Sequence, residues 1–179
     1  DLRGLKGHEI ARLGLARTFQ RETSFDTLSL YDNVLIAATY GRGGRADSAV
    51  ARSVTEALGF VGFEPASFHR VAAELSVYDR KCLMLASALA MSPRALLLDE
   101  PASGLSKPEI EQLIALIRRI AARGVAILLI EHVLTVLLTL SQRLMVLNQG
   151  KTLTHGDPDT VVQNPEVIRA YLGDRKHAA

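Results

Sequence analysis

Two short runs of apolar residues in the second half of the chain are the clearest structural signal in the sequence. They are Ala-Leu-Leu-Leu at residues 95–98 and Val-Ala-Ile-Leu-Leu-Ile at residues 125–130. Runs of this length are typical of strands buried on both faces of a parallel sheet. Between them, Pro108 and Gly124 stand where a helix is expected to begin and end. The pattern therefore predicts a strand, a crossover helix and a parallel strand.

The apolar pattern continues toward the C-terminus. A further helix is expected after residue 130, then a strand at residues 143–147, a turn at Gln149-Gly150 and a short returning strand at residues 151–154. The second half is thus expected to follow a βαβαβ order in a parallel sheet. The first half is predicted to be mainly helical, with an extended segment at residues 16–20 and helices at residues 8–13, 29–39, 46–61 and 79–91.

Composition and charge indicate an ordered globular protein. The 179 residues are 48% hydrophobic and 22% charged, close to ordinary folded proteins. Lys and Arg total 21 against 19 Asp and Glu, a balance that argues against a nucleic-acid-binding protein. The single cysteine, Cys82, excludes an internal disulfide and is predicted to be a buried helix residue. The most apolar region, residues 125–140, contains Glu131 and His132 and is too short for a membrane-spanning helix.

Two acidic residues follow the first apolar run. Asp99 and Glu100 come directly after Leu98, and open α/β sheets bind ligands at the carboxyl ends of their strands. Adjacent carboxylates are costly to bury unless a cation or a proton accompanies them. In a nucleotide hydrolase the first carboxylate would hold Mg²⁺ and the second would act as the general base. The pair alone leaves open a second interpretation, in which it caps the loop after an ordinary strand.

A histidine follows the second apolar run. His132 stands two residues after Ile130, so it is expected at the same sheet edge as Asp99 and Glu100. An imidazole there can hydrogen-bond a terminal phosphate or an attacking water. Taken alone, His132 is better explained by a local hydrogen bond at a helix start. Together with the acidic pair, the functional interpretation is favoured.

Four further segments carry a family resemblance. In chain order they are GHEIARLG at residues 7–14, RTFQ at residues 17–20, PASGLS at residues 101–106 and NPEVIRAYLG at residues 164–173. The second resembles the Q-loop, and the third the loop after the Walker B strand, of the ATP-binding subunits of ABC transporters. The first and last are similar to segments of their branched-chain amino-acid importer subfamily. The resemblance covers nearly the whole chain.

The resemblance implies a fold and a division into parts. The fold is α/β: an incomplete P-loop NTPase domain of the ABC ATPase type, with a parallel sheet, crossover helices and a helical subdomain. Residues 1–20 are then the remaining N-terminal part of the core with the Q-loop. Residues 21–92 are the helical subdomain with a degenerate signature segment, and residues 93–179 are the parallel-sheet core lobe with a C-terminal tail.

The resemblance also implies a site for ATP and Mg²⁺. In it, Asp99 is the Mg²⁺ ligand and Glu100 is the general base. His132 is the switch residue near the terminal phosphate. Gln20 senses the Mg²⁺ ion and the attacking water, while its loop meets the membrane subunit. Ser76, in the signature segment, has a hydroxyl able to meet a γ-phosphate.

The implied function is that of a subunit that couples ATP hydrolysis to the import of branched-chain amino acids. Its implied partners are membrane permease subunits and a second ATP-binding subunit, in a homodimer or heterodimer that sandwiches two ATP molecules. No nucleic-acid partner is expected. The implied location is cytoplasmic, peripheral on the inner face of the cell membrane.

The phosphate-binding loop G-x-x-x-x-G-K-[ST] is absent from the sequence. Gly150-Lys151-Thr152 imitates its ending, but Met145 stands where the first glycine belongs, and the context is a turn between strands. The family places this loop upstream of Asp1. We therefore expect an N-terminally truncated domain that does not hydrolyse ATP alone, with an exposed edge or apolar face on its sheet.

The signature segment also departs from the family pattern L-S-G-G-Q. Leu75 and Ser76 are retained, but Val77 and Tyr78 stand at the two glycine positions. Glycines there allow a phosphate close to the helix start. The Tyr78 ring could block that approach, or it could turn away and pack, and the sequence leaves both open.

Two other functions remain open at the level of the sequence. The chain could be a non-hydrolysing docking or regulatory partner of a membrane permease, which the altered signature favours. It could also be a fragment without a cellular role. The retained Gln20, Asp99, Glu100 and His132 argue against long decay of the catalytic half.

Overall fold

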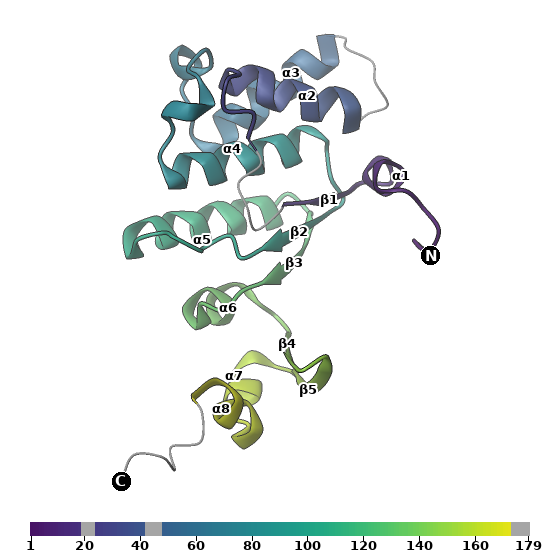
Figure 1. Ribbon diagram of the computed structural model, residues 1–179, viewed down its shortest axis with the longest axis vertical. Coiled ribbons are helices and arrows are strands. Elements are labelled where there is room, and N and C mark those ends of the chain that lie inside the picture. Colours follow the sequence, from purple (N-terminus) through teal and green to yellow (C-terminus); the bar gives the residue numbers. More distant parts are fainter. Residues whose placement is uncertain (19–23, 42–47, 173–179) are drawn as a thin grey trace. The chain divides into compact units, whose positions relative to one another are not determined.

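A parallel sheet of three strands stands at the centre of the first of two compact units, Asp1–Glu131. The computed structural model describes residues 1–18, 24–41 and 48–172. The strands are β1 (Leu15–Arg17), β2 (Ala95–Asp99) and β3 (Ala126–Ile130), in the order β1-β2-β3 (Figure 1). In their parallel register Leu97 pairs with Arg17 on one side and with Leu128 on the other. The predicted strand, crossover helix and parallel strand are confirmed.

The crossover helix α5 (Lys107–Ala121) begins where its sequence predicts. The Ser106 backbone N–H donates to the Glu109 carboxylate at 2.7 Å, and Pro108 occupies the first turn. Such a capping box satisfies N–H groups that a helix start leaves without intrahelical partners. One stripe of the helix is buried, formed by Leu113, Ile114, Leu116, Ile117 and Ile120.

Three helices pack against one another in the same unit (Figure 1). They are α2 (Leu30–Gly41), α3 (Ser48–Val61) and α4 (Val77–Ala90). Their shared core contains Leu30, Val34, Val54, Leu58, Leu83 and Leu85. The short helix α1 (Gly7–Arg12) precedes β1, and two 3-10 turns, η1 (Pro65–Ser67) and η2 (Ala72–Glu74), connect α3 to α4. The predicted helical first half is therefore confirmed.

The second compact unit, His132–Ala179, contains a hairpin and short helices. Its elements are α6 (Leu134–Leu140), β4 (Leu144–Asn148), β5 (Lys151–Gly156), α7 (Pro158–Val162) and α8 (Pro165–Leu172). The predicted turn and returning strand are confirmed, because β4 pairs antiparallel with β5. The expectation that residues 143–147 continue the parallel sheet is wrong, because β4 and β5 form a separate two-stranded sheet. Gln149 and Gly150 both have positive φ, 48° and 77°. A two-residue turn of this kind returns the chain antiparallel beside itself.

That hairpin turn also contains the sequence that imitates the end of a phosphate-binding loop. Gly150 lies in the turn, and Lys151 and Thr152 begin β5. A phosphate-binding loop needs a strand before it and a helix after it. Here a strand follows, so the prediction that this segment is an imitation is confirmed.

Strand β3 leaves apolar side chains in contact with solvent. Leu128 is 59% exposed and Ile130 is 57% exposed, although the sequence predicted a strand buried on both faces. The expected exposed apolar face of the sheet is therefore present on β3. In the part of the chain that the structure describes, no helix has the length and apolar character needed to cross a membrane.

Candidate functional site at the ends of strands β2 and β3

The carboxyl ends of β2 and β3 lie side by side. Asp99, the last residue of β2, pairs in parallel register with Ile130, the last residue of β3. Glu100 follows Asp99, and its backbone N–H donates to the Ile130 carbonyl at 2.8 Å. The acidic pair therefore lies beside the end of β3. His132 comes two residues after Ile130, is exposed, and begins the second compact unit.

The loop after β2 is held by contacts that sequence reasoning missed. Glu100 has a φ of 47°, a left-handed conformation that is uncommon for a residue with a side chain. The carboxylate of Glu131 is buried and accepts the Ala102 backbone N–H at 2.6 Å. The only signal in the sequence was the position of Glu131 between a strand and the candidate histidine.

A second missed contact is an ion pair between neighbouring strands. The Arg17 guanidinium, on β1, lies 3.1 Å from a carboxylate oxygen of Asp99. The side chain of Asp99 is 23% exposed, so the carboxylate is partly shielded from water. Arg17 therefore supplies a positive charge at the position where the resemblance expects Mg²⁺.

The chemistry of Asp99 suits Mg²⁺ as part of a larger set of ligands. Carboxylate oxygens are ligands that Mg²⁺ prefers, and proteins often hold this ion by one or two carboxylates together with phosphates and water. Within the described ranges, no group of three or more His, Cys, Asp or Glu side chains is arranged to hold a metal. Gln20, the other predicted Mg²⁺ contact, lies outside the described residues.

The signature segment begins helix α4. The Ser76 hydroxyl accepts the Asp79 backbone N–H at 3.1 Å and donates to the Asp79 carboxylate at 2.9 Å. Ser76 is thus the N-cap of the helix, which starts at Val77, two residues earlier than predicted. For the predicted contact of Ser76 with a γ-phosphate, this hydroxyl would have to give up its hydrogen bond with the Asp79 N–H or bond the phosphate in addition.

The orientation of Tyr78 favours the alternative in which its ring turns away from the helix start and packs. Its hydroxyl hydrogen-bonds the thiol of Cys82, one turn further along α4, and partial burial together with that thiol raises the pKa of Tyr78. The side chain therefore lies along the helix, away from its N-terminus. Cys82 is 2% exposed, which confirms the prediction that it is a buried helix residue.

Comparison with known proteins decides the family. The ABC transporter family model matches residues 2–103, and the model for branched-chain amino acid ATP-binding cassette transporters matches residues 151–177. The chain belongs to the ABC transporter ATP-binding family. The resemblance found in the sequence is thereby confirmed.

Curated relatives support the same assignment. The chain is 35% identical to the high-affinity branched-chain amino acid transport ATP-binding protein BraF of Pseudomonas aeruginosa, over 97% of this chain and 73% of that protein. It is 36% identical to LivG of Salmonella typhimurium, over the same shares of the two chains. It is also 34% identical to the lipopolysaccharide export ATP-binding protein LptB of Acidithiobacillus ferridurans, over 98% and 71%.

Solved structures confirm the fold. A nucleotide-free ATP-binding cassette of an ABC transporter superposes with a TM-score of 0.81 at 22% identity, over 93% of this chain and 72% of that one. The ATP-binding cassette MJ1267 gives 0.85 at 23% identity, over 97% and 74%. The predicted α/β fold of the ABC ATPase type is confirmed. The roles of Gln20, Ser76, Asp99, Glu100 and His132 stay predictions.

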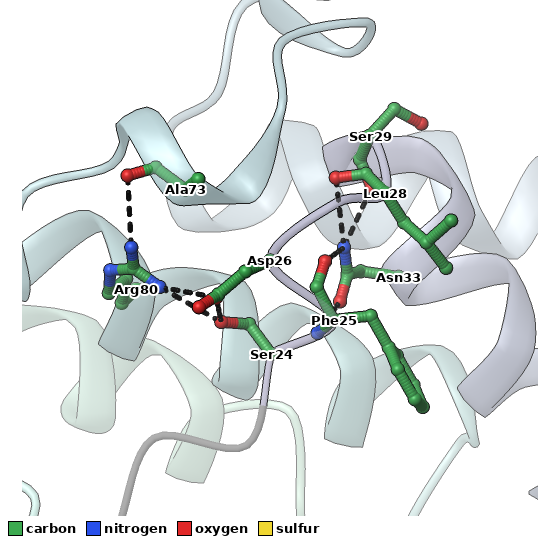
Figure 2. A network of polar contacts seen from close by, with 8 residues as sticks. All are labelled: Ser24, Phe25, Asp26, Leu28, Ser29, Asn33, Ala73 and Arg80. Atoms are coloured by element: carbon green, nitrogen blue, oxygen red, sulfur yellow. Dashed lines mark hydrogen bonds and ion pairs between the residues drawn. The ribbon is translucent and has the colours of Figure 1, made fainter.

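In this ABC ATP-binding chain, an arginine ties the signature helix to the segment that follows the Q-loop residues. The Arg80 guanidinium donates to the Asp26 carboxylate at 2.7 Å, to the Ser24 hydroxyl at 3.1 Å and to the Ala73 carbonyl at 3.0 Å. Figure 2 shows the guanidinium between these groups. The hydrogen bonds from Arg80, and then from Ser24, lower the pKa of Asp26.

The same segment is held from the other side by a buried amide (Figure 2). The Asn33 side chain accepts the Phe25 backbone N–H at 2.8 Å and donates to the carbonyls of Phe25 and Ser29 at 3.1 and 2.9 Å. These bonds fix the backbone at Phe25, whose ring is 54% exposed. Phe25 lines a pocket of about 200 Å³ between the end of β1 and helices α2 and α4, together with Arg17, Met84 and Met91.

Proposed function

We propose that this chain is the ATP-binding subunit of an ABC importer for branched-chain amino acids, coupling ATP hydrolysis to transport. The observation that carries the proposal is the acidic pair Asp99-Glu100 at the end of β2, beside the end of β3, in a chain of this family. The identity to BraF and LivG, whose names give branched-chain amino acid transport, supports the substrate class.

The proposed division of labour follows from the chemistry of each side chain. Asp99 would contribute a carboxylate to Mg²⁺, which when bound would neutralise charge on the nucleotide phosphates. Glu100 accepts a proton from the attacking water. His132 would hydrogen-bond the terminal phosphate, Gln20 would contact the metal and the water, and Ser76 would meet the phosphate bound by the second subunit.

We propose further that this chain by itself does not turn over ATP. A phosphate-binding loop supplies backbone N–H groups and a lysine to the phosphates. The printed sequence contains no G-x-x-x-x-G-K-[ST] segment. Hydrolysis would therefore depend on groups that these residues do not provide.

The proposed partners are the membrane permease subunits of the importer and a second ATP-binding subunit. We place the permease contact at the pocket beside Phe25, because the exposed ring and the methionines Met84 and Met91 offer an apolar surface next to the Q-loop residues. The proposed location is accordingly cytoplasmic, peripheral on the inner face of the cell membrane.

Two observations at the start of α4 favour a second candidate, a non-hydrolysing partner that docks on the permease. Ser76 is engaged as the cap of α4, and the signature glycines are replaced by Val77 and Tyr78. Such a chain would keep the pocket beside Phe25 and use neither Glu100 nor His132. A fragment without any role is the third candidate.

A complementation experiment separates the three candidates. Uptake of radiolabelled leucine is measured in cells that lack the gene, and then in the same cells supplied with the intact gene or with the gene carrying Glu100→Gln. The proposal expects uptake to fall on deletion and to return with the wild type but not with Glu100→Gln. Equal rescue by both would favour the docking partner, and no effect of deletion would contradict the importer function.

A further inference from the structure

We propose that Glu131 is a positioning residue that holds the backbone of residues 100–102 and so fixes the direction in which Glu100 presents its carboxylate. The inference rests on the proposed function in one respect, the assignment of Glu100 as general base. Its structural part stands on contacts inside the first compact unit, Asp1–Glu131.

The backbone at Glu100 needs such support. Its φ of 47° lies in the left-handed region, where the Cβ of an L-residue comes too close to the following carbonyl oxygen. A residue keeps this conformation only when its surroundings hold it there. A change in this φ would swing the carboxylate of Glu100 away from its present direction, because the side chain is attached at the strained residue.

Several hydrogen bonds hold the turn. The Glu100 N–H donates to the Ile130 carbonyl at 2.8 Å, and the Ser103 N–H donates to the Glu100 carbonyl at 3.1 Å. These are backbone bonds that most residues could make at these positions. The third bond, from the Ala102 N–H to the Glu131 carboxylate at 2.6 Å, depends on a particular side chain.

The environment of Glu131 gives this third bond its strength. The residue is 8% exposed and Ala102 is 2% exposed, so water does not compete freely for either group. Hydrogen bonds to an ionised acceptor are shorter and stronger than neutral ones, and an unbonded buried carboxylate would be costly. Glu131 therefore resists displacement of the loop more than a neutral acceptor would.

The position of Glu131 in the chain adds a second consequence. Glu131 directly precedes His132, so its side chain binds the loop of the candidate general base while its backbone leads into the candidate switch residue.

The first test uses the ¹⁵N-labelled chain without nucleotide, so it is independent of the importer function. Glu131→Ala and Glu131→Gln are compared with the wild type and with Glu111→Ala, an exposed glutamate on α5. The measurements are the amide proton shift and exchange rate of Ala102 and the backbone coupling constant of Glu100, which reports φ. We expect Ala102 exchange to be roughly tenfold to hundredfold faster in Glu131→Ala.

Glu131→Gln keeps an acceptor but removes the charge, so we expect an intermediate effect on Ala102. It also keeps the test valid if Glu131→Ala does not fold. Glu111→Ala is expected to leave all three quantities unchanged. Unchanged values for Ala102 and Glu100 in the folded Glu131 variants would overturn the proposal.

The second test is the leucine-uptake complementation. Glu131→Gln is expected to restore a larger share of uptake than Glu131→Ala, while Glu111→Ala restores the wild-type level. If the wild type itself fails to restore uptake, the proposed function fails, and the amide measurements still decide the structural role. If both Glu131 variants restore full uptake, the positioning of Glu100 by Glu131 is refuted.

Discussion

Cys82 illustrates how burial controls the chemistry of a single side chain. Its thiol is enclosed on α4, and this burial raises its pKa to about 11, although the hydrogen bond from Tyr78 acts in the opposite direction. At pH 8 a thiol with this pKa is only about one-thousandth ionised, and the thiolate is the reactive form. Folding therefore protects this cysteine both by enclosure and by keeping it protonated.

We expect labelling of Cys82 by a thiol reagent at pH 8 to be at least ~100-fold slower in the folded chain than in urea. The sequence contains one cysteine, so the signal has a single source. Because folding raises the pKa of Cys82, the protonated thiol contributes to the stability of the folded chain. This contribution is complete below the pKa of the unfolded thiol and is lost as the pH rises toward 11. Equal labelling rates in the two states would contradict the buried placement.

At the scale of elements, sequence reasoning succeeded where the signal was local. The runs at residues 95–98 and 125–130 predicted β2 and β3 because continuous apolar residues are needed wherever a parallel strand forms. The Arg17–Asp99 and Glu131–Ala102 contacts could not be predicted, because they depend on the register between strands far apart in the chain. The strand at residues 143–147, the turn after it and the returning strand were found. Their place in the parallel sheet was wrong, because an apolar run does not show which strands it will pair with.

Helix α4 and the segment at residues 24–26 are joined by the Arg80–Asp26 pair, and this junction has a pH dependence. Arg80→Leu is expected to raise the pKa of Asp26 toward the ordinary range, because the hydrogen bond from Arg80 is the main cause of its lowering. The measurement is an NMR titration of the Asp26 carboxyl carbon. Arg70→Leu is the control, because Arg70 pairs with Glu74 instead.

The sign of the effect on stability follows from the direction of this shift. Since folding lowers the pKa of Asp26, the ionised carboxylate contributes to the stability of the folded chain. This contribution is present above the pKa of the unfolded carboxyl and is lost as the pH falls through the pKa of the folded one. Arg80→Leu should therefore flatten the acid side of the stability profile. An Asp26 titration that is the same in wild type and Arg80→Leu would rule out this account of the junction.

At the scale of the whole molecule, the sheet has an enclosed strand beside an exposed one. Leu98 on β2 is 1% exposed, whereas Leu128 on β3 is 59% exposed. Leu98→Ala is expected to lower the free energy of unfolding by about 2–5 kcal/mol, because it leaves a cavity. Leu128→Ala, the matched control, should change it by no more than about 0.5 kcal/mol. Urea denaturation of both variants measures the difference, and equal losses would show that β3 is enclosed.

The central claim is that the end of β2 beside β3 is the metal and nucleotide site. Mn²⁺, which takes the same oxygen ligands as Mg²⁺, is added with ATP to the ¹⁵N-labelled chain, and paramagnetic broadening of the amide signals is measured. We expect the strongest broadening at residues 99–102, and its loss in Asp99→Asn. Broadening confined to other residues, or the same broadening in Asp99→Asn, would contradict the claim.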